Sequence, residues 1–459
     1  MFLNVQMNSN SLIDMGIYMS LRYYRDKTFF DFIKFREFVI FNTYKCISNV
    51  GIFNTEWIKG INNFTRTMKA LTWSKRLLSF SGVWPMEIRD SLFVPFLFYG
   101  CHYSFLGLLD MIEYIKDFRY VLINIRENML MLMTLTKFGM CRIKYRSLSR
   151  FLTETENDYT VDNYKTKEER LIFMKYNKFS YIFIMMSFPS MTFILLLYYF
   201  KTVIPSILMV MTNSSLEYKL PYKIKPLLKP YDAKSYTFGC IHEFFRTIII
   251  LSGYIGTDSL LATTGFHLTG QLAILKCRAK NVVNDTDGCR EGIRKMILRH
   301  HRLIRLADIL EDSFNIVIGQ HLFGTTLQLC ISYYQMLSSL TVLEGIGILS
   351  FFMYISLLSG TLFTYCYIGE CLIQESTSLC EALYHCNWYE LSTIDMKSIC
   401  ICMMRARKPL KLTCVKLCIV SLRTFTESLS YNRHLVNHSE VINGLPISTT
   451  NVYLDRIVT

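Results

Sequence analysis

The sequence predicts an all-α polytopic membrane protein with seven transmembrane helices, and three observations carry this prediction. The 459-residue chain is 51% hydrophobic but only 19% charged, whereas soluble proteins carry about a quarter charged residues. Its apolar residues are gathered in runs of roughly twenty, the length of helix that crosses a bilayer. Its basic residues lie between these runs, where they orient spans and form no compact nucleic-acid surface. We therefore expect a lipid bilayer, and no nucleic acid, as a partner.

The apolar runs define the expected spans in chain order. The first, Ser91–Leu109, contains no charged residue. The second, Tyr120–Cys141, is weaker because it contains Arg126, Glu127 and Lys137. The remaining expected spans are Phe179–Phe200, Arg246–Lys276, Ser313–Leu343, Gly345–Gly369 and Pro409–Leu429.

The distribution of lysine and arginine predicts the orientation of the chain. The segment before the first span, the loop between spans two and three, and the loop between spans four and five are rich in basic residues, which favours the cytosolic side. The loop between spans three and four also contains lysines, but fewer. We expect a cytosolic N-terminus and, after seven crossings, an extracellular C-terminus, the opposite of a G-protein-coupled receptor. Asn213 begins an Asn-Ser-Ser acceptor in an expected outer loop, so it is the expected glycosylation site.

The residues give no reason to expect an enzyme, a cofactor or a metal site. Asp258 and His267 are nine residues apart in the fourth span and do not share a helical turn. His300-His301 has no acidic cluster beside it, and the cysteines form no paired Cys-x-x-Cys units with zinc spacing.

The most specific pattern lies between Phe363 and Thr413. An apolar run ends at Tyr365-Cys366, and a series of small, aromatic and charged residues follows at fixed spacing: Gly369, Leu372, Glu375-Ser376, Ala382, Tyr384, Trp388-Tyr389, Met404-Arg405, Pro409-Leu410 and Leu412-Thr413. This order resembles the signature of the insect odorant receptor family, whose members are seven-helix, odorant-gated cation channels. Gly82-Val83-Trp84-Pro85 is similar to the weaker motif that precedes the family's first span.

The resemblance implies a function and an organisation of the chain. It implies that the chain is the ligand-binding subunit of a heterotetramer, formed with the obligate odorant co-receptor in the plasma membrane of olfactory neuron dendrites. This heterotetramer would conduct cations non-selectively when a small volatile odorant binds. The expected segments are a cytosolic segment (1–88), six helices with an odorant-binding outer bundle (89–370), a cytosolic subunit-contact segment (371–408) with one helix over about Ser376–Met404, a pore-lining helix (409–431) and an atypical polar tail (432–459).

Charged residues in the last span are the first candidates for the pore. Lys416 and Arg423 are seven residues apart and would share one helical face, and Glu427 follows one turn later. This face would line water or a subunit contact; the alternative is that these charges snorkel or pair within one bundle. The resemblance adds Thr413 to the pore and suggests a gating role for Asp258, whose alternative role is to hydrogen-bond neighbouring helices.

Two further sets of residues are expected to contact a ligand and a neighbouring subunit. Aromatic, weakly polar walls suit a small volatile ligand, although aromatic residues in spans also pack helices or mark the membrane interface. The expected ligand contacts are Phe193, Tyr198, Tyr199, Phe244, Phe245, Ile248, Phe351, Phe352 and Tyr354. The subunit contacts that the resemblance implies are Glu375, Ser376, Tyr384, Trp388, Tyr389 and Arg405.

Two alternative functions remain open. A gustatory-type chemoreceptor channel would share this architecture, although the spacing of Glu375-Ser376 and Trp388-Tyr389 favours the odorant branch. A secondary transporter is the alternative from another class. An odd number of spans and the lack of an internal repeat are arguments against it.

Overall fold

The computed structural model describes residues 64–160, 163–211, 219–282, 289–339 and 345–430, which lie in one compact unit, Gly60–Thr459. The predictions for residues 1–63, for Asn213 and for the tail 432–459 fall outside the described residues.

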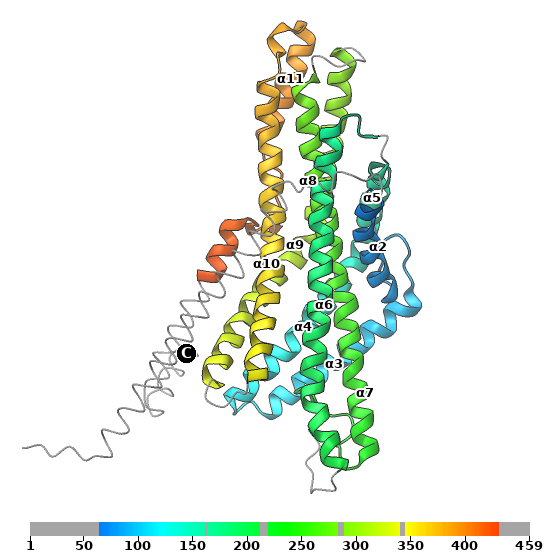
Figure 1. Ribbon diagram of the computed structural model, residues 1–459, viewed down its shortest axis with the longest axis vertical. Helices are drawn as coiled ribbons and strands as arrows, with labels where there is room; N and C mark the ends of the chain where they lie inside the picture. The colour runs from blue at the N-terminus through cyan, green and yellow to red at the C-terminus, as the bar shows by residue number, and fades with distance from the viewer. Residues whose placement is uncertain (1–63, 161–162, 212–218, 283–288, 340–344, 431–459) are drawn as a thin grey trace, which may run out of the picture. The chain divides into compact units, whose positions relative to one another are not determined.

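Apart from one small hairpin, the regular secondary structure of the described residues is helical, which confirms the all-α prediction (Figure 1). The α-helices are α2 (Phe64–Phe80), α3 (Asp90–Glu113), α4 (Phe118–Ile143), α5 (Tyr145–Glu156), α6 (Lys167–Met211), α7 (Ala233–Ile250), α8 (Gly256–Lys280), α9 (Cys289–Ser339), α10 (Gly345–Tyr384) and α11 (Thr393–Ala406). Short elements complete the chain: the 3₁₀ turns η3 (Asn157–Tyr159) and η7 (Trp388–Glu390), the π-helical turn η5 (Leu251–Ile255), and the strands β1 (Thr413–Cys414) and β2 (Cys418–Ile419).

Capping residues and apolar length explain where several helices begin and how far they run. Asp117 caps α4 by accepting a hydrogen bond from the backbone N–H of Tyr120 at 3.1 Å, and Asp232 and Ser235 form a capping box at the start of α7. Helices α6, α9 and α10 contain 45, 51 and 40 residues. Since about twenty residues cross the hydrocarbon core, each continues for several turns beyond the span expected from its apolar run.

The core of the bundle is α8. Its side chains are buried almost throughout, and it packs against α10, α6, α2 and α9 (Figure 1). Small residues allow this close approach: a Cβ added at Gly265 would lie 2.6 Å from Ile368 of α10. The π-helical turn η5 joins α7 to α8, so the expected fourth span belongs to one continuous helix, Ala233–Lys280.

Length and apolar character identify four membrane-spanning candidates within the described ranges: Asp90–Glu113, Lys167–Leu208, Ala233–Lys280 and Ser350–Tyr384. Helices α4 and α9 coincide with two more expected spans but contain more polar residues. Many of these polar side chains are buried, among them Glu127 and Lys137 of α4 and His321 and Gln328 of α9. These two helices therefore direct many of their polar groups into the bundle.

The structure corrects the expected cytosolic helix over Ser376–Met404. Helix α10 continues to Tyr384, the chain turns through η7, and α11 begins at Thr393. Ser392 starts this separate helix because its hydroxyl accepts a hydrogen bond from the backbone N–H of Asp395 at 3.3 Å. The prediction of a single helix across this segment was wrong.

The structure also corrects the first half of the expected helix Pro409–Leu429. Strands β1 and β2 pair antiparallel, and the turn between them places Val415 and Lys416 at φ of 50° and 61°. Such left-handed backbone does not continue into an α-helix. The last helix begins only at Leu422 and is described as far as residue 430.

Candidate functional site

A cavity of about 630 Å³ lies at one end of the bundle and is the candidate ligand site. It lies among the N-terminal part of α4, the C-terminal part of α6, the segment 219–230 and the N-terminal part of α10. Helices α3, α7 and α9 also contribute polar side chains to its wall. Its lining includes Asp110, Tyr120, Arg126, Glu127, Leu195, Tyr198, Lys201, Tyr222, Lys223, Arg246, Gln335, Phe351 and Tyr354.

Three of the nine expected ligand residues line this cavity: Tyr198, Phe351 and Tyr354. The structure places the other six elsewhere. Tyr199 is buried, and its hydroxyl donates to the carbonyl of Cys240 at 3.0 Å. Phe193, Phe244, Phe245, Ile248 and Phe352 do not line the cavity, and the side chain of Phe193 is 52% exposed.

Glu127 is the polar centre of the cavity wall, and the expected ligand contacts did not include it. Its carboxylate accepts a hydrogen bond from the Tyr198 hydroxyl and one from the backbone N–H of Lys223 at 2.7 Å. The guanidinium of Arg246 donates to the backbone carbonyl of Glu127 and lies 4.0 Å from the Tyr222 ring centroid. A charge in an apolar span was the sequence signal for this residue, because such charges are costly unless they are paired.

A second buried polar cluster holds the middle of the bundle together. Asp258 of α8 pairs with Lys137 of α4, and both side chains are fully buried. The same carboxylate accepts a hydrogen bond from the Tyr365 hydroxyl of α10 at 2.6 Å, and the Tyr365 ring stacks on His321 of α9 with centroids 4.2 Å apart. Asp258 therefore hydrogen-bonds neighbouring helices, as the alternative role predicted.

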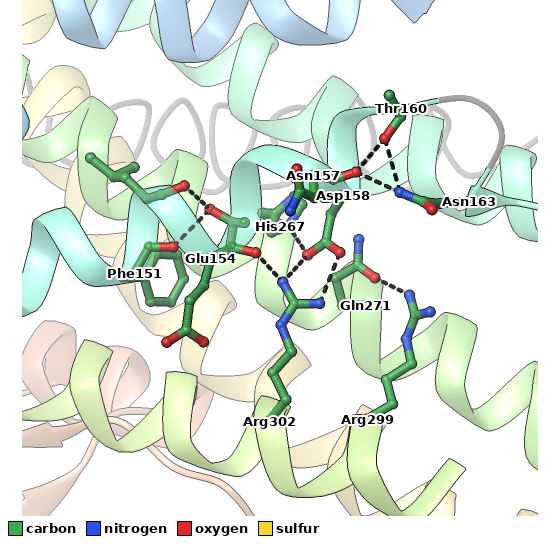
Figure 2. Close-up of polar contacts among 12 residues, drawn as sticks. Phe151, Glu154, Asn157, Asp158, Thr160, Asn163, His267, Gln271, Arg299 and Arg302 are labelled. Atoms are coloured by element: carbon green, nitrogen blue, oxygen red, sulfur yellow. Dashed lines mark hydrogen bonds and ion pairs between the residues drawn. The ribbon is translucent and has the colours of Figure 1, made fainter. Parts of the chain in front are cut away.

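A third cluster is centred on Asp158 of η3, which lies outside the membrane-spanning segments, and includes His267 of α8 (Figure 2). Arg302 of α9 holds both carboxylate oxygens of Asp158 at 2.9 Å, and Nε2 of His267 lies 3.3 Å from one of them. Burial opposes ionisation of Asp158, but the hydrogen bonds from His267 and Arg302 outweigh it and lower the pKa to about 2. His267 thus pairs with Asp158 and not with Asp258. Among the described residues, no group of three His, Cys, Asp or Glu side chains could hold a metal ion.

Replacing Asp158 with asparagine should destabilise the folded protein by about 2 kcal/mol at neutral pH, from the drop in pKa from 3.8 to about 2. Because the folded-state pKa is depressed, this contribution is complete above the unfolded pKa and is lost as the pH falls toward 2. Thermal unfolding of the solubilised protein at pH 7 is the measurement. Glu156→Gln, which removes an exposed acid two residues away, is the matched control. Equal unfolding temperatures for wild type and Asp158→Asn would contradict the assignment.

The expected subunit-contact residues divide into two groups. Glu375 and Ser376 make contacts within the chain. The Glu375 carboxylate accepts a hydrogen bond from the Tyr176 hydroxyl at 2.8 Å and lies 2.5 Å from the Lys276 ammonium. The Ser376 hydroxyl accepts a hydrogen bond from the backbone N–H of Leu410 at 3.0 Å. Tyr384, Trp388, Tyr389 and Arg405 lie in α10, η7 and α11, where both tyrosines are well exposed.

The expected pore residues do not form one helical face. Thr413 and Lys416 lie in the hairpin that precedes the last helix. Arg423 and Glu427 lie on that helix and form an exposed pair at 2.8 Å, one turn apart. The shared face of Lys416 and Arg423 was a wrong prediction, since only Arg423 is helical.

Helix α10 connects the cavity to this C-terminal segment. It carries Phe351 and Tyr354 in the cavity wall. Further along, a Cβ added at Gly369 would lie 2.2 Å from the carbonyl oxygen of Val420, and the Glu370 carboxylate accepts from the backbone N–H of Leu422 at 3.3 Å. One helix therefore contacts both the candidate ligand site and the start of the last helix.

Comparison with known proteins gives consistent sequence matches. The sequence model described as 7tm Odorant receptor matches residues 124–431. Odorant receptor 13a of Drosophila melanogaster is 26% identical over 234 residues, which cover 46% of this chain and 54% of that receptor. The odorant receptor coreceptor of Ooceraea biroi is 31% identical over 142 residues, which cover 30% of this chain and 29% of the coreceptor. The chain thus spans about half or less of the length of these relatives.

A solved structure shares the fold. The olfactory receptor OR5 from Machilis hrabei in complex with eugenol matches with a TM-score of 0.68 and 14% identity, covering 83% of this chain and 100% of that chain. At this identity the likeness shows the fold alone. Since the sequence model matches well over half of the residues, this chain belongs to the 7tm odorant receptor family.

Proposed function

We propose that this chain is the ligand-binding subunit of a heteromeric, odorant-gated, non-selective cation channel in olfactory sensory neurons. The observation that carries the proposal is the cavity of about 630 Å³ with tyrosine and phenylalanine side chains in its wall, in a chain of the odorant receptor family. A cavity of this size and lining suits one small, weakly polar molecule held mainly by burial.

The partner is an odorant co-receptor, with which the chain forms a heterotetramer in the plasma membrane of the neuronal dendrite. Similarity to coreceptors from Ooceraea biroi and Drosophila melanogaster supports a common mode of assembly. The exposed tyrosines Tyr384 and Tyr389 are available for subunit contact. The last helix, from Leu422, lines the pore, and the N-terminus is cytosolic, so the cavity opens outward. An N-terminal tag labelled only after permeabilisation would support this orientation; labelling in intact cells would contradict it.

Ligand opens the channel by binding the open state more tightly than the closed state. Helix α10 is the element best placed to transmit this preference, because it lines the cavity at Phe351 and contacts the backbone of Val420 and Leu422. A gustatory-type channel would use the same architecture. It is the second candidate, and it would respond to non-volatile ligands without the odorant co-receptor.

Truncation of Phe351 to alanine should change the ranking of agonists and shift the half-maximal concentration of the best agonist by about tenfold, because about 1–3 kcal/mol of aromatic burial is lost. Dose–response currents in cells that also express the co-receptor are the measurement. Phe193→Ala is the control, since Phe193 is exposed and does not line the cavity. Unchanged curves for Phe351→Ala, at equal surface expression, would contradict this site.

A further inference from the structure

The charged side chains of the cavity wall are unequal in number. Two acids and five bases line it: Asp110 and Glu127 against Arg126, Lys201, Lys219, Lys223 and Arg246. Both acids are occupied by donors from the protein itself. Asp110 accepts from the Tyr120 hydroxyl and the Asn124 amide, each at 2.9 Å, and Glu127 accepts from Tyr198 and Lys223. The wall therefore presents an excess of positive charge to anything that enters.

Arg126 is the base best placed to meet a ligand. Its side chain is only 11% exposed, and the guanidinium carbon lies 5.8 Å and 5.3 Å from the ring centroids of Tyr198 and Phe351. Both rings also line the cavity. The apolar wall and this cation are therefore contiguous.

The guanidinium of Arg126 is poorly satisfied within the chain. Among the described residues its hydrogen bond goes to the Tyr198 hydroxyl at 3.4 Å, and the nearest carboxylate oxygen, of Glu127, lies at 3.7 Å. Charge-assisted hydrogen bonds are normally about 2.7–2.9 Å long, and a guanidinium has five N–H donors. Arg246 also lines the cavity and differs in its accessibility: it donates to the Glu127 carbonyl, and among the described residues its Nε and Nη1 have no hydrogen-bond partner, but it is fully buried against the Tyr222 ring. Arg126 is therefore the more accessible of the two guanidinium groups.

We propose that this cavity selects small carboxylic acids, with the carboxylate bound by Arg126 and the hydrocarbon part held against Tyr198, Phe351 and Tyr354. This inference rests on the proposed function of the cavity as an odorant site. A carboxylate supplies the short bidentate hydrogen bonds that a guanidinium favours, and it neutralises a cation that is otherwise partly desolvated. A neutral alcohol or aldehyde of the same chain length supplies one weaker bond.

The test compares matched ligands on matched variants. Hexanoic acid, its methyl ester, hexanal and hexanol are applied to cells that express this chain with the co-receptor, and the half-maximal concentration for current is measured. We expect the acid to be the most potent by at least about tenfold. Arg126→Gln should remove that advantage, measured as the ratio of the half-maximal concentrations of hexanol and the acid. Arg126→Lys should retain part of it, because lysine keeps the charge without the planar fork.

Arg119→Gln is the control variant. It removes one positive charge from the same helix at an exposed residue outside the cavity, so the preference for the acid should persist. Neutral ligands that are as potent as the acid, or an acid preference that survives in Arg126→Gln, would overturn the inference while leaving the odorant-site proposal intact. Failure of a broad panel of acids and neutral volatiles to evoke current from surface-expressed protein would instead count against the proposed function itself.

Discussion

Replacement of Lys137 by methionine should remove most of the protein from the cell surface. Lys137 and Asp258 are both fully buried, and the variant would leave the Asp258 carboxylate without its cation in the middle of the bundle. Loss of one partner of a buried ion pair costs about 3–5 kcal/mol, against a total stability of about 5–15 kcal/mol for a typical domain. Surface labelling of an epitope-tagged protein is the measurement.

A double variant separates the loss of the charge pair from the loss of Lys137 packing. In Lys137→Met with Asp258→Asn, no charge is left uncompensated, and the asparagine oxygen can still accept the Tyr365 hydroxyl that now bonds to Asp258 at 2.6 Å. Replacement of both members of a buried pair is often nearly neutral, so surface expression should recover. A double variant as poorly expressed as the single one would show that the charge pair is not the reason for the loss.

Substitution of Gly369 by alanine should abolish most of the ligand-evoked current while the protein still reaches the surface. The added methyl group would lie 2.2 Å from the Val420 carbonyl oxygen, a backbone atom that cannot rotate away as a side chain could. Overpacking of this kind costs about 1–3 kcal/mol, enough to shift a closed–open equilibrium by up to about a hundredfold. Current amplitude normalised to surface labelling is the measurement.

Gly360 supplies the matched control on the same helix. A Cβ at this residue meets nothing within 4 Å, and alanine in a helix interior is more favourable than glycine by about 0.5–1 kcal/mol. Gly360→Ala should therefore leave the current unchanged. Equal losses in both variants would mean that the effect comes from the helix α10 backbone and not from its contact with Val420.

The membrane fold could be predicted because uncharged runs of about twenty residues have few alternatives, and the match to the 7tm odorant receptor family confirms the seven-helix class. Helix ends could not be predicted in the same way. Helix α6 starts at Lys167, about twelve residues before the apolar run at Phe179. These residues are polar, and a hydropathy pattern does not show that a polar segment is helical. The hairpin after Pro409 was missed because short strands give little periodicity.

The candidate site was only partly predictable from the sequence. The ligand residues were chosen by their expected depth in the membrane, whereas the face of the helix on which a side chain lies decides whether it lines the cavity. Phe351 and Tyr354 are three residues apart, share a face of α10 and line the cavity, whereas Phe352 does not. The partner of Asp258 was also out of reach. Charged residues inside spans are expected to pair, but nothing in the sequence relates Lys137 to a residue 121 positions away.

Whole-cell recording during odorant application, in cells that express this chain, the co-receptor or both, tests the central claim most directly. We predict a ligand-evoked cation current in cells that express both chains, with dose dependence that differs from that of the co-receptor alone. Accumulation of a labelled ligand inside the cells without any evoked current, from protein shown to be at the surface, would contradict the channel and favour a transporter.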